Sequence, residues 1–134
     1  MRIVAVLLWF NVIVFSLYGV AFILFPKELA WMVVAATPTS DAALIDMRAT
    51  YGGTNLGIGL LIGYLSLSKL TFRHALQAVF LINSVMALAR GYGLFLSETQ
   101  SSVMFIYLGL EIGAALLSYY LLKRHKRDFY HPYY

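Results

Sequence analysis

Long apolar stretches alternate with short polar segments along the whole chain. A membrane-crossing helix needs about 20 mostly apolar residues, and four stretches have that length. They are residues 3–25, 42–67, 75–96 and 103–122. Because short connections favour antiparallel neighbours, the pattern predicts an all-α integral membrane protein. We expect a four-helix bundle of up-down-up-down topology that forms one domain over residues 1–134.

Polar and helix-breaking residues separate the apolar stretches. Pro26 ends the first one, because proline disfavours helical backbone at the residue before it. Residues 27–40 are too few to cross a bilayer and carry Trp31 near their centre, which indicates a segment at the membrane interface. Ser40 or Asp41 is a candidate N-cap for the second helix.

Composition supports the membrane class and narrows the chemistry. Apolar residues make up 61% of the chain, charged residues 12%, and the mean hydropathy is +0.78. A soluble domain has roughly 45–50% apolar and about 25% charged residues. The chain has no cysteine, which excludes disulfides and thiolate metal sites. The three histidines show no metal-ligand spacing and no catalytic triad order is present, so we expect no metal, no cofactor and no enzymatic activity.

The basic residues near the ends of the predicted spans predict the orientation. One side of the membrane receives Arg2, Lys69, Arg73 and the basic tail of residues 123–134. The opposite side has only Lys27 outside the spans. The positive-inside rule therefore places both termini in the cytoplasm. The formal net charge of +4 is too small and too clustered to indicate a nucleic-acid partner.

Four charged residues, Asp46, Arg48, Arg90 and Glu111, lie in or beside the predicted spans. A charge at bilayer depth costs at least about 2.5–3.5 kcal/mol, so such residues are expected to face a protein interior and to find partners there. They mark the candidate functional site of this chain.

Helical spacing places these charges on polar stripes of their helices. Residues three or four apart share a face, which groups Arg48 with Tyr51 and Asn55, and Tyr107 with Glu111. At 1.5 Å per residue, Arg48, Arg90 and Glu111 lie about 10, 9 and 12 Å from the outer ends of their spans. The sequence therefore predicts one cluster in the outer half of the bilayer. Its members are Asp46, Arg48, Tyr51, Asn55, Arg90, Tyr107 and Glu111.

The predicted cluster has more than one interpretation. Two arginines and two carboxylates sum to zero charge, so they can form a structural clamp between helices. This hypothesis describes a non-enzymatic accessory or interaction protein of the inner membrane, with a lipid headgroup as a candidate occupant. Alternatively, Arg48, Arg90 and Glu111 line an outward-opening pocket of a small-molecule or lipid binding or transport protein, because arginine suits carboxylate and phosphate groups. A proton relay would need a further ionisable residue near the midplane, where only Asn55 and Asn83 lie.

Glycines at small-xxx-small spacing predict where helices approach closely. Glycine lets helix backbones come together, which replaces the hydrophobic driving force that lipid removes. The candidates for such packing are Gly52, Gly53, Gly57, Gly59, Gly63, Gly109 and Gly113. Gly109 and Gly113 lie on the side of their helix opposite Glu111. We therefore expect membrane lipid, and either a second copy of the chain or another membrane protein, as partners.

The run from Asp46 to Gly59 resembles the R-x-x-Y-G-G-x-x-x-x-x-G pattern of domain-of-unknown-function family 4345. Members of that family are small four-helix membrane proteins of bacteria. The matching residues are Arg48, Tyr51, Gly52, Gly53, Gly59, Arg90 and Glu111. The family's glycine-containing turn after the third span is replaced here by residues 97–102. The resemblance implies the four-helix fold and a bacterial inner-membrane location, and it implies no activity.

Overall fold

The computed structural model describes residues 2–96 and 102–125. These residues are all-α, with one π-helical and one 3-10 segment between the α-helices. The chain divides into two compact units, and each is described by itself. Residues 9–64 form the α1–α4 unit, and residues 1–8 with 65–134 form the α5–α6 unit.

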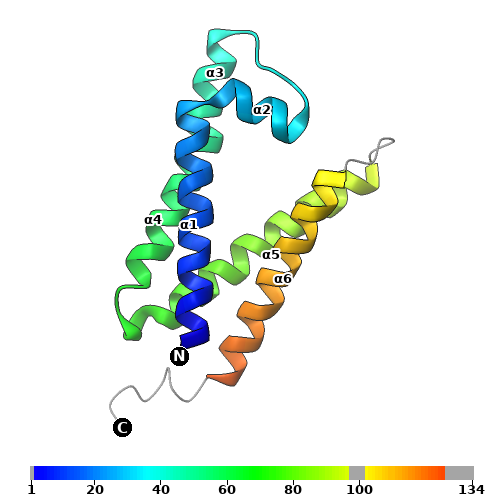
Figure 1. Cartoon of the computed structure of the whole chain (residues 1–134). Coiled ribbons are helices and arrows are strands. Elements are labelled where there is room, and N and C mark those ends of the chain that lie inside the picture. The colour runs from blue at the N-terminus through cyan, green and yellow to red at the C-terminus, as the bar shows by residue number, and fades with distance from the viewer. Residues whose placement is uncertain (1, 97–101, 126–134) are drawn as a thin grey trace. The chain divides into compact units, whose positions relative to one another are not determined.

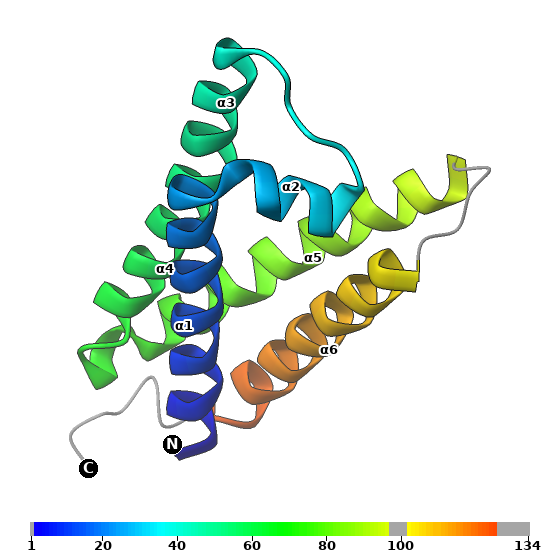
Figure 2. The same ribbon diagram turned by 45° about the horizontal axis from the view of Figure 1, so that its top comes forward.

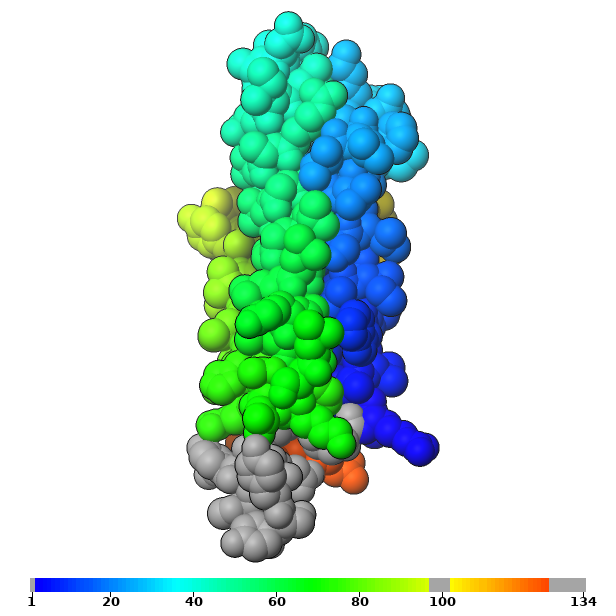
Figure 3. All heavy atoms as spheres, turned by 90° about the vertical axis from the view of Figure 1, so that its left-hand side faces the viewer, coloured from blue at the N-terminus to red at the C-terminus, as the bar shows by residue number. Residues whose placement is uncertain are grey.

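In the α1–α4 unit, α1 (Arg2–Leu24) lies beside a second helical run that is made of three elements (Figures 1 and 3). These elements are α3 (Asp41–Met47), the π-helical segment η1 (Arg48–Gly53) and α4 (Thr54–Leu65). The run has no non-helical residue from Asp41 to Leu65. Sequence reasoning predicted an uninterrupted helix over 42–67, and the π-helical segment is the difference.

The connection between these two helical runs contains a short helix, α2 (Pro26–Val34). Pro26 occupies the first turn of α2, where a missing N–H costs nothing, and Phe25 before it is not helical. α2 turns away from the axis of α1, as Figure 2 shows. Ser40 is the N-cap of α3, because its hydroxyl accepts a hydrogen bond of 3.2 Å from the Ala43 backbone N–H.

The α5–α6 unit is built on two long helices that run side by side (Figures 1 and 2). They are α5 (Phe72–Leu96), preceded by the 3-10 turn η2 (Lys69–Thr71), and α6 (Ser102–Arg124). Phe80 on α5 meets Tyr119 on α6 with ring centroids 5.9 Å apart, and Arg90 meets Glu111. From the first contact to the second, the residue number rises on α5 and falls on α6. The two helices are therefore antiparallel.

Three helical stretches within the described residues are long and apolar enough to cross a membrane. They are Arg2–Leu24, Lys69–Leu96 and Ser102–Arg124. The predicted starts at residues 3, 75 and 103 differ from the observed helix starts by one to three residues. α4, with 12 residues, and α3, with 7, are each too short to be counted as a span separately.

Many large apolar side chains of the described residues are exposed, and several polar side chains are buried. Large apolar side chains such as Val6, Leu88 and Phe95 are more than two thirds exposed. The buried polar residues include Asn11, Ser66, Asn83, Glu111 and Ser118. Apolar surface that is exposed on this scale needs a lipid or protein environment, because water would disfavour it. Burial therefore supports the membrane class independently of helix length.

Candidate functional site

The centre of the candidate site is an ion pair between Arg90 of α5 and Glu111 of α6. Arg90 Nε donates to both carboxylate oxygens of Glu111 at 3.0 Å, and Arg90 Nη2 lies 2.6 Å from Glu111 Oε1. The Glu111 side chain is 7% exposed and that of Arg90 is 23% exposed. A guanidinium that presents a planar edge to a carboxylate makes strong, directional hydrogen bonds. The pair thus joins α5 to α6 with fixed geometry.

Two further side chains of α6 complete the surroundings of Arg90. The guanidinium carbon lies 5.2 Å from the centre of the Tyr107 ring, within the range of a cation–π interaction. Arg90 Nη1 donates to Met104 Sδ at 3.2 Å, which is a soft and weak acceptor. Tyr107 was a predicted member of the site, and Met104 was not. Both lie on the turns of α6 that precede Glu111.

Buried polar groups elsewhere on these two helices bond within their own helix. Asn83 Nδ2 donates to the Val79 carbonyl at 2.8 Å, and Ser118 Oγ donates to the Ala114 carbonyl at 2.7 Å. Such bonds to the carbonyl four residues earlier satisfy a buried polar side chain locally. Arg90 and Glu111, by contrast, form an ionic contact between α5 and α6.

Arg48, the second predicted arginine, lies in the α1–α4 unit and has a different role there. Its Nε donates to the backbone carbonyl of Ile23 at 3.1 Å. Ile23 belongs to the last turn of α1, where carbonyls have no helical partner and the helix macrodipole is negative. A cation there both satisfies a carbonyl and complements the dipole. Arg48 thus caps α1, a role that its helical spacing did not reveal.

The other predicted residues of this unit surround the π-helical segment. Asp46 Oδ1 accepts a hydrogen bond from the Thr50 hydroxyl at 3.1 Å. Asn55 Nδ2 donates to the Tyr51 carbonyl at 2.6 Å. Tyr51 lies in the π-helical segment, where backbone hydrogen bonds join residues five apart and not four apart as in an α-helix. The Tyr51 ring stacks on Phe22 of α1 at 5.4 Å. Each of these contacts holds η1 in shape or against α1.

Close approach of α1 to the η1–α4 run occurs at three glycines. A Cβ added to Gly52 would lie 2.6 Å from Ile23 Cγ1, and one added to Gly59 would lie 2.9 Å from the Ser16 backbone nitrogen. A Cβ on Gly19 of α1 would overlap the backbone of Leu56. Gly52 and Gly59 were sequence candidates, whereas Gly19 has no glycine four residues away and was missed.

The remaining candidate glycines have more space. An added Cβ at Gly63 would make ordinary contact with Val12 at 3.6 Å, and one at Gly53 would lie 3.8 Å from the Arg48 carbonyl. At Gly57, Gly109 and Gly113, no described atom lies within 4 Å of an added Cβ. The spacing of glycines in the sequence does not distinguish those at a close helix contact from those with open space. It does not show which face of a helix packs against a neighbouring helix.

The structure thus brings together Arg90, Tyr107 and Glu111 in the α5–α6 unit, and Asp46, Arg48, Tyr51 and Asn55 in the α1–α4 unit. Within the described residues, no group of three or more His, Asp or Glu side chains is arranged to hold a metal ion. The fold and the ion pair define a helical, multi-pass membrane-type protein with a buried arginine–glutamate pair.

Comparison with known families identifies one family for this chain. The chain belongs to the family described as "Domain of unknown function (DUF4345)", whose model matches residues 3–122. The matched region contains Arg48, Arg90 and Glu111 and nearly all of the three candidate spanning helices. The predicted family is confirmed. No curated protein and no solved structure matches the chain.

The capping role of Arg48 leads to a first prediction. Arg48→Met keeps the length of the side chain and removes its donors, so we expect a loss of about 1 kcal/mol in the free energy of unfolding. Arg48→Lys should keep most of the stability, because an ammonium group also complements the end of α1. The measurement is a denaturant titration of the purified protein in detergent micelles.

Asp46→Asn is the matched control for Arg48→Met, because it changes a charge on the same helical run and keeps an acceptor for Thr50. It should change stability by less than half as much. Equal losses in Arg48→Lys and Arg48→Met would contradict the capping role, since they would mean that the planar fork of arginine is required.

Proposed function

We propose that this chain is a non-enzymatic accessory or interaction protein of the bacterial inner membrane, in which Arg90 and Glu111 clamp α5 to α6. The chain would cross the membrane four times with both termini in the cytoplasm. The helical run Asp41–Leu65 would provide the fourth crossing, because its length suits a bilayer of about 30 Å. The clamp would then lie in the outer half of the membrane.

The geometry of Arg90 on Glu111 is the observation that carries this proposal. The Nε and Nη2 groups form the edge of the guanidinium that best fits a carboxylate, and Glu111 already binds that edge. A headgroup phosphate would have to compete with a buried internal carboxylate for the same donors. The charges of the two side chains cancel, so the pair needs no external ion.

A role in interaction is supported by the outer surface of the spanning helices. Gly109 and Gly113 lie on α6 away from Glu111, and a Cβ at either would meet no described atom within 4 Å. In lipid, small residues allow a neighbouring helix to approach closely. We therefore place the contact with another membrane protein, or with a second copy of the chain, on this side of α6.

Exchanging the two charges tests the clamp. In Arg90→Glu combined with Glu111→Arg the ion pair is reversed but still present, whereas each single exchange brings two like charges together. We expect the double variant to unfold within about 1 kcal/mol of the parent protein and each single variant to lose at least about 3 kcal/mol. Thermal unfolding in detergent measures this difference.

Mass spectrometry of co-purified lipid separates the clamp from the alternative. In the double variant, the positive charge is on α6 and no longer on α5. A binding or transport protein with an outward pocket over Arg48, Arg90 and Glu111 would therefore lose its bound species in this variant. A clamp would leave the lipid composition unchanged. A double variant that folds normally but loses a bound species would therefore favour the alternative over the clamp.

A further inference from the structure

Close contacts fix the register between α1 and the helical run that leads into α4. Cβ atoms added to Gly59 and Gly52 would meet Ser16 and Ile23 of α1, respectively. The residue number falls along the run as it rises along α1, so the two are antiparallel. Arg48, one turn before Gly52, donates through Nε to the Ile23 carbonyl at 3.1 Å. The sequence placed Arg48 about 10 Å inside a span, whereas this register places it level with the last turn of α1.

The part of the run that precedes Arg48 continues past the end of α1. This part is α3 (Asp41–Met47), and Figures 1 and 2 show it beyond the last turn of α1. None of the 7 residues of α3 is buried. η1 and α4, with 6 and 12 residues, together have the length that crosses about 30 Å of hydrocarbon. The run therefore contains one crossing, η1 with α4, and one exposed extension, α3.

α2 has the side chains of a helix that lies along a membrane surface. It begins at Pro26, directly after α1, and turns away from the axis of α1 (Figure 2). Its exposed residues include Lys27 in the first turn, and Trp31 and Met32, which are 63% and 72% exposed. Tryptophan is typical of the boundary between lipid and water, and 9 residues are too few to cross a bilayer. α2 is therefore suited to the membrane surface at the level of Arg48.

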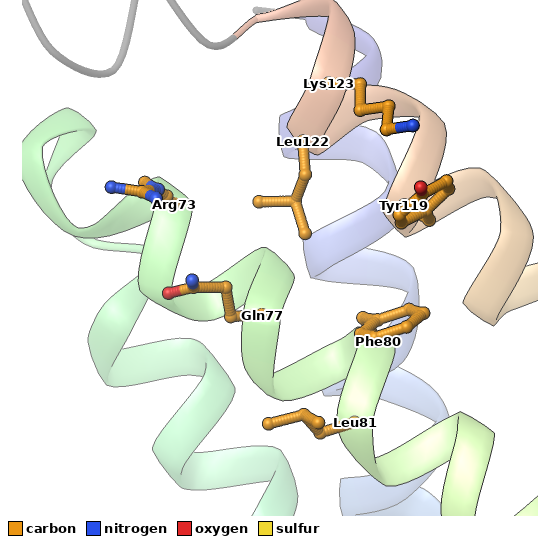
Figure 4. A pocket seen from close by; sticks show the side chains of 7 residues that line it. All are labelled: Arg73, Gln77, Phe80, Leu81, Tyr119, Leu122 and Lys123. Carbon is orange, nitrogen blue, oxygen red and sulfur yellow. The ribbon is translucent and has the colours of Figure 1, made fainter.

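A spanning helix of the α5–α6 unit ends in a similar combination of residue types. Lys123 lies in the last turn of α6, and its Nζ is 4.6 Å from the centre of the Tyr119 ring. Both side chains line a groove between α5 and α6 (Figure 4). A cation and an aromatic ring thus mark a helix end in each unit, as expected where helices leave a membrane.

The guanidinium of Arg48 can bind two acceptors at once. Arg48 is an exposed residue, and its Nε is directed at the Ile23 carbonyl. A guanidinium has five N–H donors, four of them on the two Nη groups, so a phosphate can bind beside the carbonyl. Asp46 is two residues away, and residues two apart do not face each other on a helix. The Asp46 carboxylate accepts a hydrogen bond from Thr50.

We propose that Arg48 binds the phosphate of one phospholipid at the membrane surface, with α2 in the headgroup layer and α3 outside the bilayer. A phospholipid is the occupant that fits, because its phosphate lies at the level of α2 and arginine binds phosphate with two parallel hydrogen bonds. The hydrocarbon part of the fourth crossing then starts at Arg48. The proposal rests on the membrane location given in the proposed function and does not depend on the clamp.

Two cysteine variants test the level of the membrane surface. The parent chain has no cysteine, so each variant has a single thiol. Ile45→Cys is in α3 and Leu60→Cys is in α4, and the parent side chains are similarly exposed, at 66% and 62%. Both variants are treated with a charged maleimide in proteoliposomes made permeable to the reagent. We expect Ile45→Cys to react at least about tenfold faster, because the reactive thiolate forms in water and not in lipid.

The two reaction rates separate this proposal from the proposed function. Slow reaction of both thiols would place α3 inside the bilayer, which overturns the proposal and leaves the fourth crossing intact. Rapid reaction of both thiols would mean that α4 is not in lipid, which contradicts the fourth crossing as well as the proposal.

Native mass spectrometry of the full chain in detergent tests the phosphate contact. Phosphatidylcholine is compared with monoglucosyl diacylglycerol, which has the same acyl chains and no phosphate. We expect the parent protein to bind phosphatidylcholine at least about fivefold more tightly, and Arg48→Gln to reduce this preference to less than about twofold. Arg48→Lys, which should keep most of the stability, is expected to lower the preference as well, because an ammonium group cannot form a fork to a phosphate.

A control variant and a competitor complete the test. Arg124→Gln removes a cation from the end of α6 and should leave the preference for phosphatidylcholine unchanged. An unchanged preference in Arg48→Gln, or an equal loss in Arg124→Gln, would overturn the phosphate contact at Arg48. Displacement of phosphatidylcholine by millimolar inorganic phosphate would overturn the assignment of a lipid as the occupant.

Discussion

Replacing Glu111 with glutamine is expected to lower the free energy of unfolding by about 3 kcal/mol. The substitution keeps the size of the side chain but leaves the Arg90 guanidinium without a counter-charge between α5 and α6. Breaking a buried ion pair from one side typically costs about 3–5 kcal/mol, and the partial exposure of Arg90 favours the lower end. Denaturant titration in detergent micelles gives the value.

The matched control for Glu111→Gln removes both charges. Arg90→Met with Glu111→Leu replaces the pair by apolar side chains of similar size, which commonly restores or even improves stability. We expect at least half of the loss to be recovered. If the apolar pair is as unstable as Glu111→Gln, the ionic contact is not what Glu111 contributes, and the clamp is wrong.

The second large effect is expected at Gly59, where α4 lies against α1. A Cβ at this position would overlap the Ser16 hydroxyl and lie 2.9 Å from the Ser16 backbone nitrogen. Backbone atoms cannot move as a side chain can, so the helices would have to separate. We expect Gly59→Ala to cost about 2 kcal/mol and Gly59→Leu considerably more, since overpacking typically costs about 1–3 kcal/mol.

Gly57 provides a control on the same helix, two residues away. No described atom lies within 4 Å of a Cβ added to it. Alanine is favoured over glycine in a helix by up to about 1 kcal/mol, so Gly57→Ala should be neutral or stabilising. Opposite signs for Gly59→Ala and Gly57→Ala in thermal unfolding would support the close approach. Similar signs and sizes for the two variants would contradict it.

Helix positions and polar faces could largely be predicted from the sequence. Pro26 marks the change from α1 to α2, and Ser40 starts α3, because proline geometry and N-capping act over only a few residues. The π-helical segment η1 could not be predicted. Its form depends on contacts of Arg48 and Tyr51 with α1, and a periodicity argument assumes 3.6 residues per turn throughout.

The candidate site was predicted in part. Helical phase placed Arg90 and Glu111 on inward faces, and the structure joins them directly. The predicted cluster also contained Arg48, whose described hydrogen bond is to the Ile23 carbonyl. Backbone carbonyls at helix ends are acceptors on every helix, so a side-chain pattern does not show which of them an arginine will meet.

The sequence by itself determined the class of this protein, its helices and the residues whose burial would need a partner. These properties follow from the cost of placing charge and unbonded backbone in lipid, which depends on local composition. Only the tertiary structure decided which partner each charge has, which glycines lie at a close contact and where α5 and α6 leave a groove. Those outcomes depend on which helix faces meet and in what register, and the period of a single helix contains no information about its neighbour.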